Sequence, residues 1–194
     1  MVIGKLRNFI NRLAPSTVGR ALAEMGVKPD HITYLGLGLA ILAPVMAAID
    51  IPWSVPVLIA VSSLMDVLDG AVARALRRTT PFGSYLDSLT DRVSDAMFIL
   101  ALIILGANVY VSIIALTFSF LVSYSRSKGE LLGVKMEGVG IAERGERSVL
   151  LLIGSLFAAM RNLLIVNALM LFLWILALIT VVQRSIHVKR GLSP

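Results

Sequence analysis

Four aspartates stand in two closely spaced pairs in the middle of the chain. Asp66 and Asp69 are three positions apart, and Asp87 and Asp91 are four apart. On a helix, each of these spacings places both carboxylates on one face. Carboxylate oxygens suit hard cations such as Mg²⁺ or Mn²⁺, and a cluster of this size can hold two ions, as in many phosphoryl-transfer sites. The residue types therefore predict a site for divalent metal ions.

Small and basic residues accompany the acids. Gly70 and Ala73 follow the first pair, and small residues let a neighbouring helix or a ligand approach the backbone closely. Arg74 lies one turn after Gly70 and can contact a phosphate or pair with an acid, while Gly83 leaves similar room one turn before Asp87. A buried Asp–Arg pair can simply hold helices together, but the combined spacing favours a functional site.

The composition indicates a membrane protein. The 194 residues are 57% hydrophobic and only 15% charged, with a mean hydropathy of +0.87, whereas soluble domains carry about 25% charge. The length suits one domain, 1–194. The chain has no cysteine, which excludes disulfide and thiol chemistry. Basic residues recur through the first positions, so we do not interpret the N-terminus as a signal peptide.

Apolar stretches predict an all-α membrane protein with six transmembrane helices in 29–187. A spanning helix needs about 20 residues, and irregular backbone cannot face lipid. The fifth stretch is short and spans only if its helix starts near Arg144. Residues 1–28 are basic and amphipathic, which predicts a surface helix bent or ended at Pro15, and 188–194 form a tail. The six stretches are 32–49, 53–73, 82–105, 108–125, 148–160 and 162–183.

The basic residues set the expected orientation. They gather before the first stretch, after the second, after the fourth and after the sixth, whereas the other loops hold only Arg161. The positive-inside rule then places both termini and the acids on the cytoplasmic side of the cell membrane. The net charge of +6 is explained by this orientation and by attraction to anionic membrane lipids. No nucleic-acid partner is needed.

The segment from Asp66 to Asp91 fits the pattern D-x2-D-G-x2-A-R-x8-G-x3-D-x3-D at every position. This resembles the signature of the CDP-alcohol phosphotransferase family. The resemblance implies transfer of a phosphoryl-linked lipid from a CDP-lipid to an alcohol, with release of CMP, two Mg²⁺ ions (or Mn²⁺) and a homodimer. By position, Asp66, Asp69 and Asp87 would bind metal. Asp91 would join the second metal and act as the general base on the acceptor hydroxyl.

The same resemblance implies a set of contacts to the CDP-lipid. Gly70 and Arg74 would line the nucleotide pocket, and Thr80 would add a contact from the loop. Residues 29–33 resemble the family's Pro-Asn-x-x-Thr element, with Asp30 in place of the commoner Asn. The expected CDP-lipid contacts are Asp30, Ile32, Thr33, Gly70, Arg74 and Thr80.

Basic residues near the proposed site indicate an acceptor that carries its own phosphate. Lys128, Arg147 and Arg184 come from three different helices, and such cations hold phosphate well. Segments around Asp91, Lys128 and Arg147 resemble the branch that makes phosphatidylinositol phosphate or archaetidylinositol phosphate, although Gly145 stands where proline is expected. That branch uses inositol 1-phosphate, and either CDP-diacylglycerol or CDP-archaeol would fit as donor.

Two alternatives remain open from the sequence. Glycerol 3-phosphate also carries a phosphate, so the basic residues do not exclude it. The acids could instead form the ion path of a cation transporter, although transporter sites usually lie near the membrane midplane.

Asp95 extends the face of Asp91 by one turn and either holds an acceptor hydroxyl or pairs with Arg126.

Overall fold

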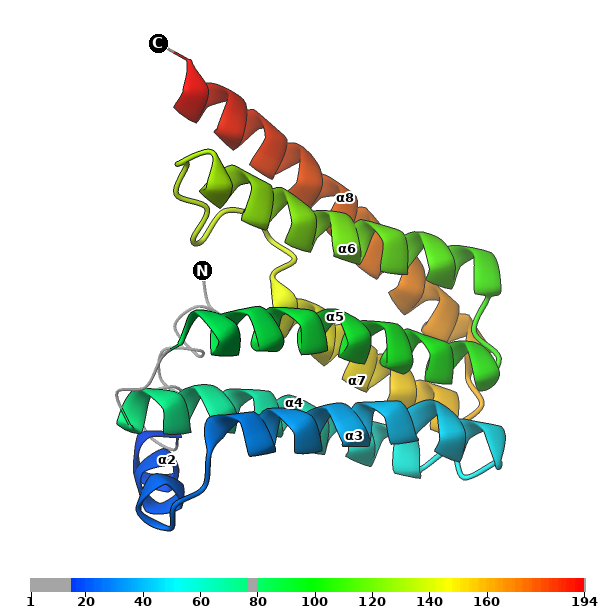
Figure 1. The fold of residues 1–194 in the computed structure, drawn as a ribbon. Helices are drawn as coiled ribbons and strands as arrows, with labels where there is room; N and C mark the ends of the chain where they lie inside the picture. The colour runs from blue at the N-terminus through cyan, green and yellow to red at the C-terminus, as the bar shows by residue number, and fades with distance from the viewer. Residues whose placement is uncertain (1–14, 77–79, 194) are drawn as a thin grey trace. The chain divides into compact units, whose positions relative to one another are not determined.

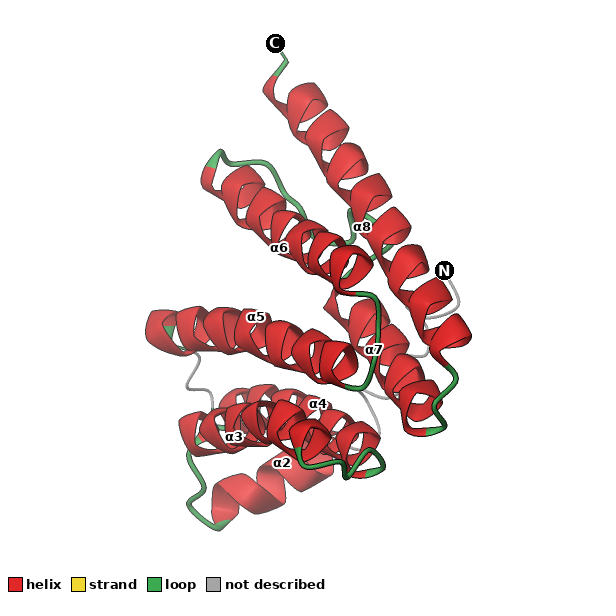
Figure 2. Ribbon diagram, turned by 90° about the vertical axis from the view of Figure 1, so that its right-hand side faces the viewer, coloured by secondary structure: helices red, strands yellow, loops and turns green. Residues whose placement is uncertain are grey.

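The computed structural model describes residues 15–76 and 80–193. This part of the chain contains seven helices and no strand, which confirms the all-α prediction (Figure 2). Residues 1–14 of the predicted surface helix (1–28) lie outside the described part, and α2 begins at Pro15. The helices are α2 (Pro15–Glu24), α3 (Pro29–Ala48), α4 (Ser54–Ala75), α5 (Pro81–Ile104), α6 (Val109–Leu131), α7 (Arg144–Ala159) and α8 (Leu163–Leu192).

Each of the six predicted apolar stretches forms one helix, α3 to α8. Both α6 and α8 continue well past the expected ends, to Leu131 and Leu192. The residues from 184 to 192 include no proline and only one glycine, so nothing local stops α8 where its apolar stretch ends. The predicted tail is therefore largely helical.

Four described helices are long and apolar enough to cross a membrane: α3, α4, α6 and α8. Helix α5 has sufficient length but carries four charged residues in its sequence, and α7 has only 16 residues. The chain is thus a multi-pass membrane protein by these four helices. The count of six spans stays a prediction, because α5 carries charged residues and α7 is short for a helix that crosses the membrane.

The chain forms two compact units. The first comprises residues up to 42 and 57–94, and the second comprises 43–56 and 95–194. In the first unit, α3 and α4 approach closely at Gly36, where a Cβ would lie 3.0 Å from the Cβ of Met65. Ser62 Oγ donates a hydrogen bond of 2.8 Å to the carbonyl oxygen of Gly36. Small residues thus bring the two helices together, as is common in membranes.

Helix α2 also packs on α4 within the first unit. A Cβ added to Gly19 would lie 2.9 Å from the carbonyl carbon and 3.0 Å from the Cβ of Ala71. Ala71 directly follows Gly70, so α2 is fixed beside the acidic segment of α4. Proline is favoured in the first turn of a helix, and Pro15 is the first residue of α2.

In the second unit, α8 packs against α6 and α7 (Figure 1). Asn108 donates its backbone N–H to the side chain of Asn167 at the start of both helices. Val122 and Arg184 are in contact further along, so α6 and α8 run in the same direction. Two loop residues with φ of 59°, Asp50 and Arg161, form an ion pair between the turns after α3 and α7.

Candidate functional site

Helix α4 presents the first two acids of the predicted site. The side chain of Asp69 is buried, with the residue only 5% exposed. Thr33 Oγ1, from α3, donates a hydrogen bond of 2.6 Å to Asp69 Oδ2, and the same Oγ1 lies 3.2 Å from the carbonyl oxygen of Pro29. The sequence singled out both residues but not the bond between them. This bond fixes the position of one carboxylate oxygen.

The structure brings three of the four acids into electrostatic range of one another. The charge of Asp69 interacts with the charges of Asp87 and Asp66. An oxygen of Asp66 lies 3.6 Å from the point that a Cβ on Gly36 would occupy, so this glycine leaves room for the carboxylate. On α5, Asp87 is exposed and Asp91 is half-buried one turn later. Three of the four acids therefore interact electrostatically within the first unit.

The donor set fits a hard divalent cation. All four predicted ligands offer carboxylate oxygens, which Mg²⁺ and Mn²⁺ prefer, and like charges this close need a compensating positive charge. Within the described residues, no group of three or more acidic or histidine side chains is already gathered at metal-binding distances. The described acids therefore do not form a closed metal cage, and their role as ligands stays a prediction.

The predicted nucleotide contacts occupy the ends of three helices. Arg74 Nη1 lies 3.2 Å from the position of a Cβ on Gly70, so the exposed guanidinium folds back over this glycine. Thr80 Oγ1 accepts a hydrogen bond of 3.0 Å from the backbone N–H of Gly83. Thr80 thus caps the start of α5, a role that the sequence analysis did not assign to it.

The remaining two contacts lie at the start of α3. Asp30 stands in the first turn of this helix, where a negative charge interacts favourably with the helix dipole. Ile32 is buried, with 6% of its surface exposed. Its side chain belongs to the core of the first unit, next to Thr33.

The basic residues predicted to bind the acceptor belong to the second unit. Arg147 is 3% exposed, and its Nη2 and Nε lie 2.9 and 3.3 Å from Asp95 Oδ2. Its Nη1 donates to the carbonyl oxygen of Ala142 at 3.1 Å. The suggested pairing of Asp95 with Arg126 is wrong, because Arg126 lies on the exposed side of α6 and pairs there with Glu130 at 3.0 Å.

Arg184 is buried as well, at 2% exposure, and donates hydrogen bonds to two backbone carbonyls. Its Nε donates to the carbonyl oxygen of Val139 at 2.9 Å, and its Nη1 donates to that of Val122. Its charge interacts with Arg126 and Arg147 as well as with Glu143 and Glu130. Two predicted arginines therefore lie in electrostatic range of each other. Lys128 remains on the exposed side of α6.

The sequence analysis missed the segment 138–142 that supports Arg184. Thr180 Oγ1 accepts hydrogen bonds from the backbone N–H groups of Ile141 and Ala142, at 3.2 and 2.9 Å. Gly140 has φ of 109°, and a Cβ there would lie 2.4 Å from Thr180 Cγ2. The Gly-Val-Gly sequence at 138–140 was the available signal, since such glycines permit positive φ and close approach.

Comparison with known proteins decides the family. The model of the CDP-alcohol phosphatidyltransferase family matches residues 27–183, most of the chain. The chain belongs to the CDP-alcohol phosphatidyltransferase family. It is therefore a membrane-bound transferase of phospholipid biosynthesis, and this phosphatidyltransferase belongs to a family that uses divalent metal. Family membership removes the cation-transporter alternative.

Curated relatives of this phosphatidyltransferase match over nearly their whole length. It is 36% identical to the archaetidylinositol phosphate synthase of Pyrococcus horikoshii over 177 residues, covering 91% of each chain. It is 38% identical to the protein of the same name from Aeropyrum pernix over 195 residues, covering 96% of each.

A solved structure is similar too. The phosphatidylinositol phosphate synthase of Mycobacterium tuberculosis with CDP-DAG bound superimposes with a TM-score of 0.77 at 28% identity, covering 90% of this chain and 93% of that one. The same mycobacterial protein has also been solved in complex with manganese and citrate.

Proposed function

We propose that this phosphatidyltransferase transfers the phosphatidyl-type group of a CDP-lipid to inositol 1-phosphate. The products are CMP and phosphatidyl- or archaetidylinositol phosphate. The observation that carries the acceptor assignment is Arg184, a buried arginine held by neutral carbonyls within range of Arg147. Two buried arginines this close together favour a phosphate on the acceptor, because guanidinium groups bind phosphate well. The names of the two archaeal relatives and of the mycobacterial one support the same acceptor.

The first unit would bind the donor. We assign the divalent metal to Asp66, Asp69, Asp87 and Asp91, as two Mg²⁺ ions, with Mn²⁺ as a substitute. The metal, when bound, neutralises charge on the donor diphosphate. Thr33 orients Asp69 through its 2.6 Å hydrogen bond, and such supporting bonds matter for metal sites. Asp30, Ile32, Gly70, Arg74 and Thr80 would form the rest of the donor site.

Asp91 would act as the general base. In this role one carboxylate oxygen accepts the proton of the acceptor hydroxyl, the hydroxyl oxygen attacks the lipid-bearing phosphorus, and the bond to the CMP oxygen breaks. A positioned base of this kind contributes about 10²–10⁴-fold in rate. Asp91 lies one turn after Asp87 on α5 and is half-buried.

The second unit would bind the acceptor phosphate, and we assign different roles to its two buried arginines. Arg147 is already neutralised by Asp95, so we assign it mainly to fixing the geometry. A guanidinium has five N–H donors. The two bonds of Arg184 to carbonyls leave donors for a phosphate. Lys128, on the exposed side of α6, would add a third cation.

Several further properties belong to the proposal. They are the six membrane spans in 29–187 within one domain, the homodimer, and the cytoplasmic position of both termini and the active site. Glycerol 3-phosphate remains the second candidate acceptor, because its phosphate would satisfy Arg184 equally well. The lipid of the donor, diacyl or ether, stays open within the proposal.

The test is CMP release by the purified protein with CDP-lipid and Mg²⁺. Inositol 1-phosphate, glycerol 3-phosphate, free inositol and serine are compared as acceptors. We expect release with inositol 1-phosphate and none with free inositol or serine. Release with glycerol 3-phosphate alone would transfer the assignment to that acceptor. Release only with an acceptor that lacks phosphate would refute our interpretation of Arg184.

A variant sharpens this test. Arg184→Ala should raise the KM for inositol 1-phosphate at least about tenfold, since a charge-assisted hydrogen bond contributes about 1.5–3 kcal/mol, and should change the KM for the CDP-lipid little. Arg126→Ala is the matched control, because Arg126 lies within range of Arg184 but is exposed and paired with Glu130. Equal effects on both KM values would contradict a phosphate-binding role.

A further inference from the structure

A groove runs along the C-terminal part of α8 in the second unit, with a volume of about 610 Å³. One wall is the segment 138–141, and the other is a face of α8. That face has the helical spacing i, i+3, i+4, i+7, and it comprises Gln183, Ile186, His187 and Arg190. Arg184 belongs to another face of the same helix, which is turned toward Val122 of α6. The groove therefore lies on a different face of α8 from Arg184, although Val139 in its other wall also accepts a hydrogen bond from Arg184 Nε.

The groove is bounded by two close contacts between the loop and α8. At one end, Gly140 approaches Thr180 so closely that a Cβ would lie 2.4 Å from Thr180 Cγ2. At the other end, a Cβ on Gly191 would lie 3.0 Å from a methyl carbon of Val134. Positions 180 and 191 are about 16 Å apart along a helix that rises 1.5 Å per residue. The loop is fixed on α8 at both points and leaves a hollow between them.

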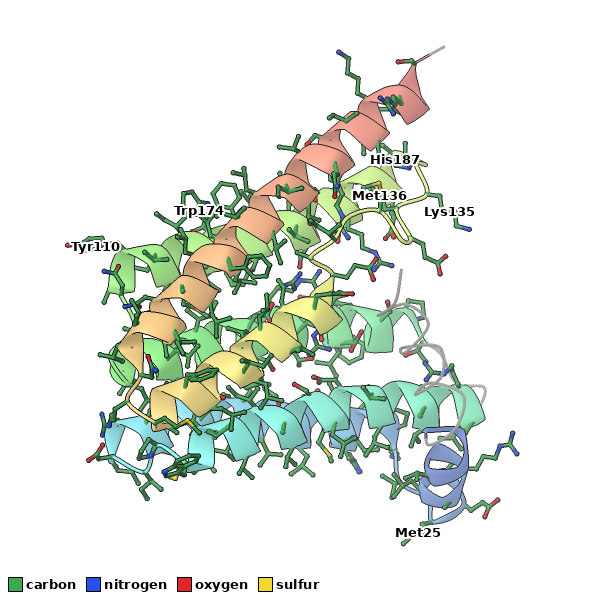
Figure 3. All side chains as sticks on the ribbon, turned by 180° about the vertical axis from the view of Figure 1, so that it is seen from behind. Met25, Tyr110, Lys135, Met136, Trp174 and His187 are labelled. Atoms are coloured by element: carbon green, nitrogen blue, oxygen red, sulfur yellow. The ribbon has the colours of Figure 1, made fainter. Side chains whose placement is uncertain are left out.

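A hydrogen bond orients the one histidine in the groove. His187 Nε2 lies 3.0 Å from the carbonyl oxygen of Lys135, and Figure 3 shows the two residues side by side with Met136 near the end of α8. A carbonyl oxygen only accepts hydrogen bonds, so Nε2 carries the proton. The other nitrogen, Nδ1, stays available to a ligand.

The lining combines an apolar and a cationic part. Val139, Ile141 and Ile186 offer hydrocarbon surface, while Arg190 and His187 offer nitrogen groups, and no acidic residue lines the groove. This combination suits a molecule with a phosphate and an attached hydrocarbon chain. The groove also lies just beyond the uncharged run of α8, which ends at Gln183, so it is expected at the level of lipid headgroups.

We propose that this groove binds the headgroup of an anionic membrane lipid, with Arg190 contacting the phosphate, His187 Nδ1 accepting a hydrogen bond from a headgroup hydroxyl, and Ile141 and Ile186 contacting the first part of the hydrocarbon chain. The site is additional to the donor and acceptor sites proposed above and does not depend on them. A free phosphate shares the headgroup chemistry, but the apolar wall favours the lipid.

The experiment measures lipid bound to the full-length protein by native mass spectrometry after reconstitution with phosphatidylglycerol or phosphatidylcholine. Arg190→Gln should weaken phosphatidylglycerol binding at least about tenfold, the loss of a charge-assisted hydrogen bond to the phosphate, and should leave phosphatidylcholine binding unchanged. Lys189→Gln is the matched control, since it removes the same charge one position earlier, from an exposed residue that does not line the groove. Thermal unfolding of both variants verifies that they remain folded.

Each outcome has a definite meaning. The proposal is supported if Arg190→Gln weakens phosphatidylglycerol binding, if adding His187→Gln weakens it further, and if Lys189→Gln leaves it unchanged. Equal weakening of phosphatidylglycerol binding in Arg190→Gln and Lys189→Gln would show an effect of general surface charge and overturn the proposal. Unchanged binding in both variants would overturn it as well. Displacement of the lipid by excess inorganic phosphate, with the same dependence on Arg190, would show that a free anion is the occupant and would likewise overturn the lipid assignment.

Discussion

Replacing Asp95 with asparagine tests whether the Asp95–Arg147 pair is as buried as the structure shows. Both side chains are 3–4% exposed, and Asp95 Oδ2 accepts from both Nη2 and Nε of Arg147. Asparagine keeps the shape and removes the charge. The variant therefore leaves Arg147 as a buried cation without its counter-charge.

The expected effect is large. Removing one partner of a buried pair costs about 3–5 kcal/mol, because the other charge stays desolvated. At 1.4 kcal/mol per tenfold change, this lowers the ratio of folded to unfolded protein by about 10²–10⁴. Glu130→Gln is the matched control. Its partner Arg126 lies at i−4 on α6, and both side chains are 47% exposed, so we expect a loss of only about 0.3–0.5 kcal/mol.

Equilibrium unfolding in mixed micelles, with one denaturing detergent titrated against a mild one, measures both losses. A double variant, Asp95→Asn with Arg147→Met, should recover part of the loss, since the isolated charge is then removed. A loss for Asp95→Asn no larger than that for Glu130→Gln would show that water reaches the pair, and the reasoning from burial would be refuted.

Four further predictions concern the donor site and the loop. Asp91→Asn should lower the rate of CMP release about 10²–10⁴-fold and preserve most CDP-lipid binding, and near-normal turnover would remove Asp91 from the base role. Thr33→Val should weaken metal activation about 10–100-fold by removing the hydrogen bond to Asp69, with Thr33→Ser close to wild type; equal losses in both would argue against that bond. Chelation with EDTA should abolish CMP release, and Mg²⁺ or Mn²⁺ should restore it. Gly140→Ala should lower the unfolding temperature, because its φ is 109° and its Cβ would collide with a neighbouring side chain, whereas Gly38→Ala, which meets open space, should not.

The helices and the acidic cluster could be predicted because their signals are local. Apolar runs of membrane length determine α3, α4, α6 and α8, and the spacing of Asp66 and Asp69 places both on one helix face. The boundaries were less accurate. The sequence analysis ended the sixth helix where its apolar residues end, but α8 continues through polar residues, which form helix equally well.

The partners of the buried cations could not be predicted, because they depend on contacts between distant segments. Arg147 meets Asp95, which lies 52 positions away, and Arg184 meets the carbonyl of Val139, 45 positions away. Every residue has a backbone carbonyl, so the sequence does not indicate which carbonyl accepts a hydrogen bond from a distant arginine. The hydrogen bond between Thr33 and Asp69 was missed for the same reason, because the sequence analysis assigned Thr33 to the CDP-lipid and Asp69 to the metal.

The ion pair between Asp50 and Arg161 has a consequence for the order in which the protein is made. Its members are 111 positions apart, and residues 43–56 belong to the second unit although residues 57–94 of the first unit follow them. During synthesis, every residue of the first unit has therefore emerged before Arg161 exists. The turn after α3 can form this ion pair only after the end of α7 has been synthesised. Contacts between segments so far apart in the sequence form slowly. The half of the protein that carries the four aspartates can thus assemble while the chain is still growing.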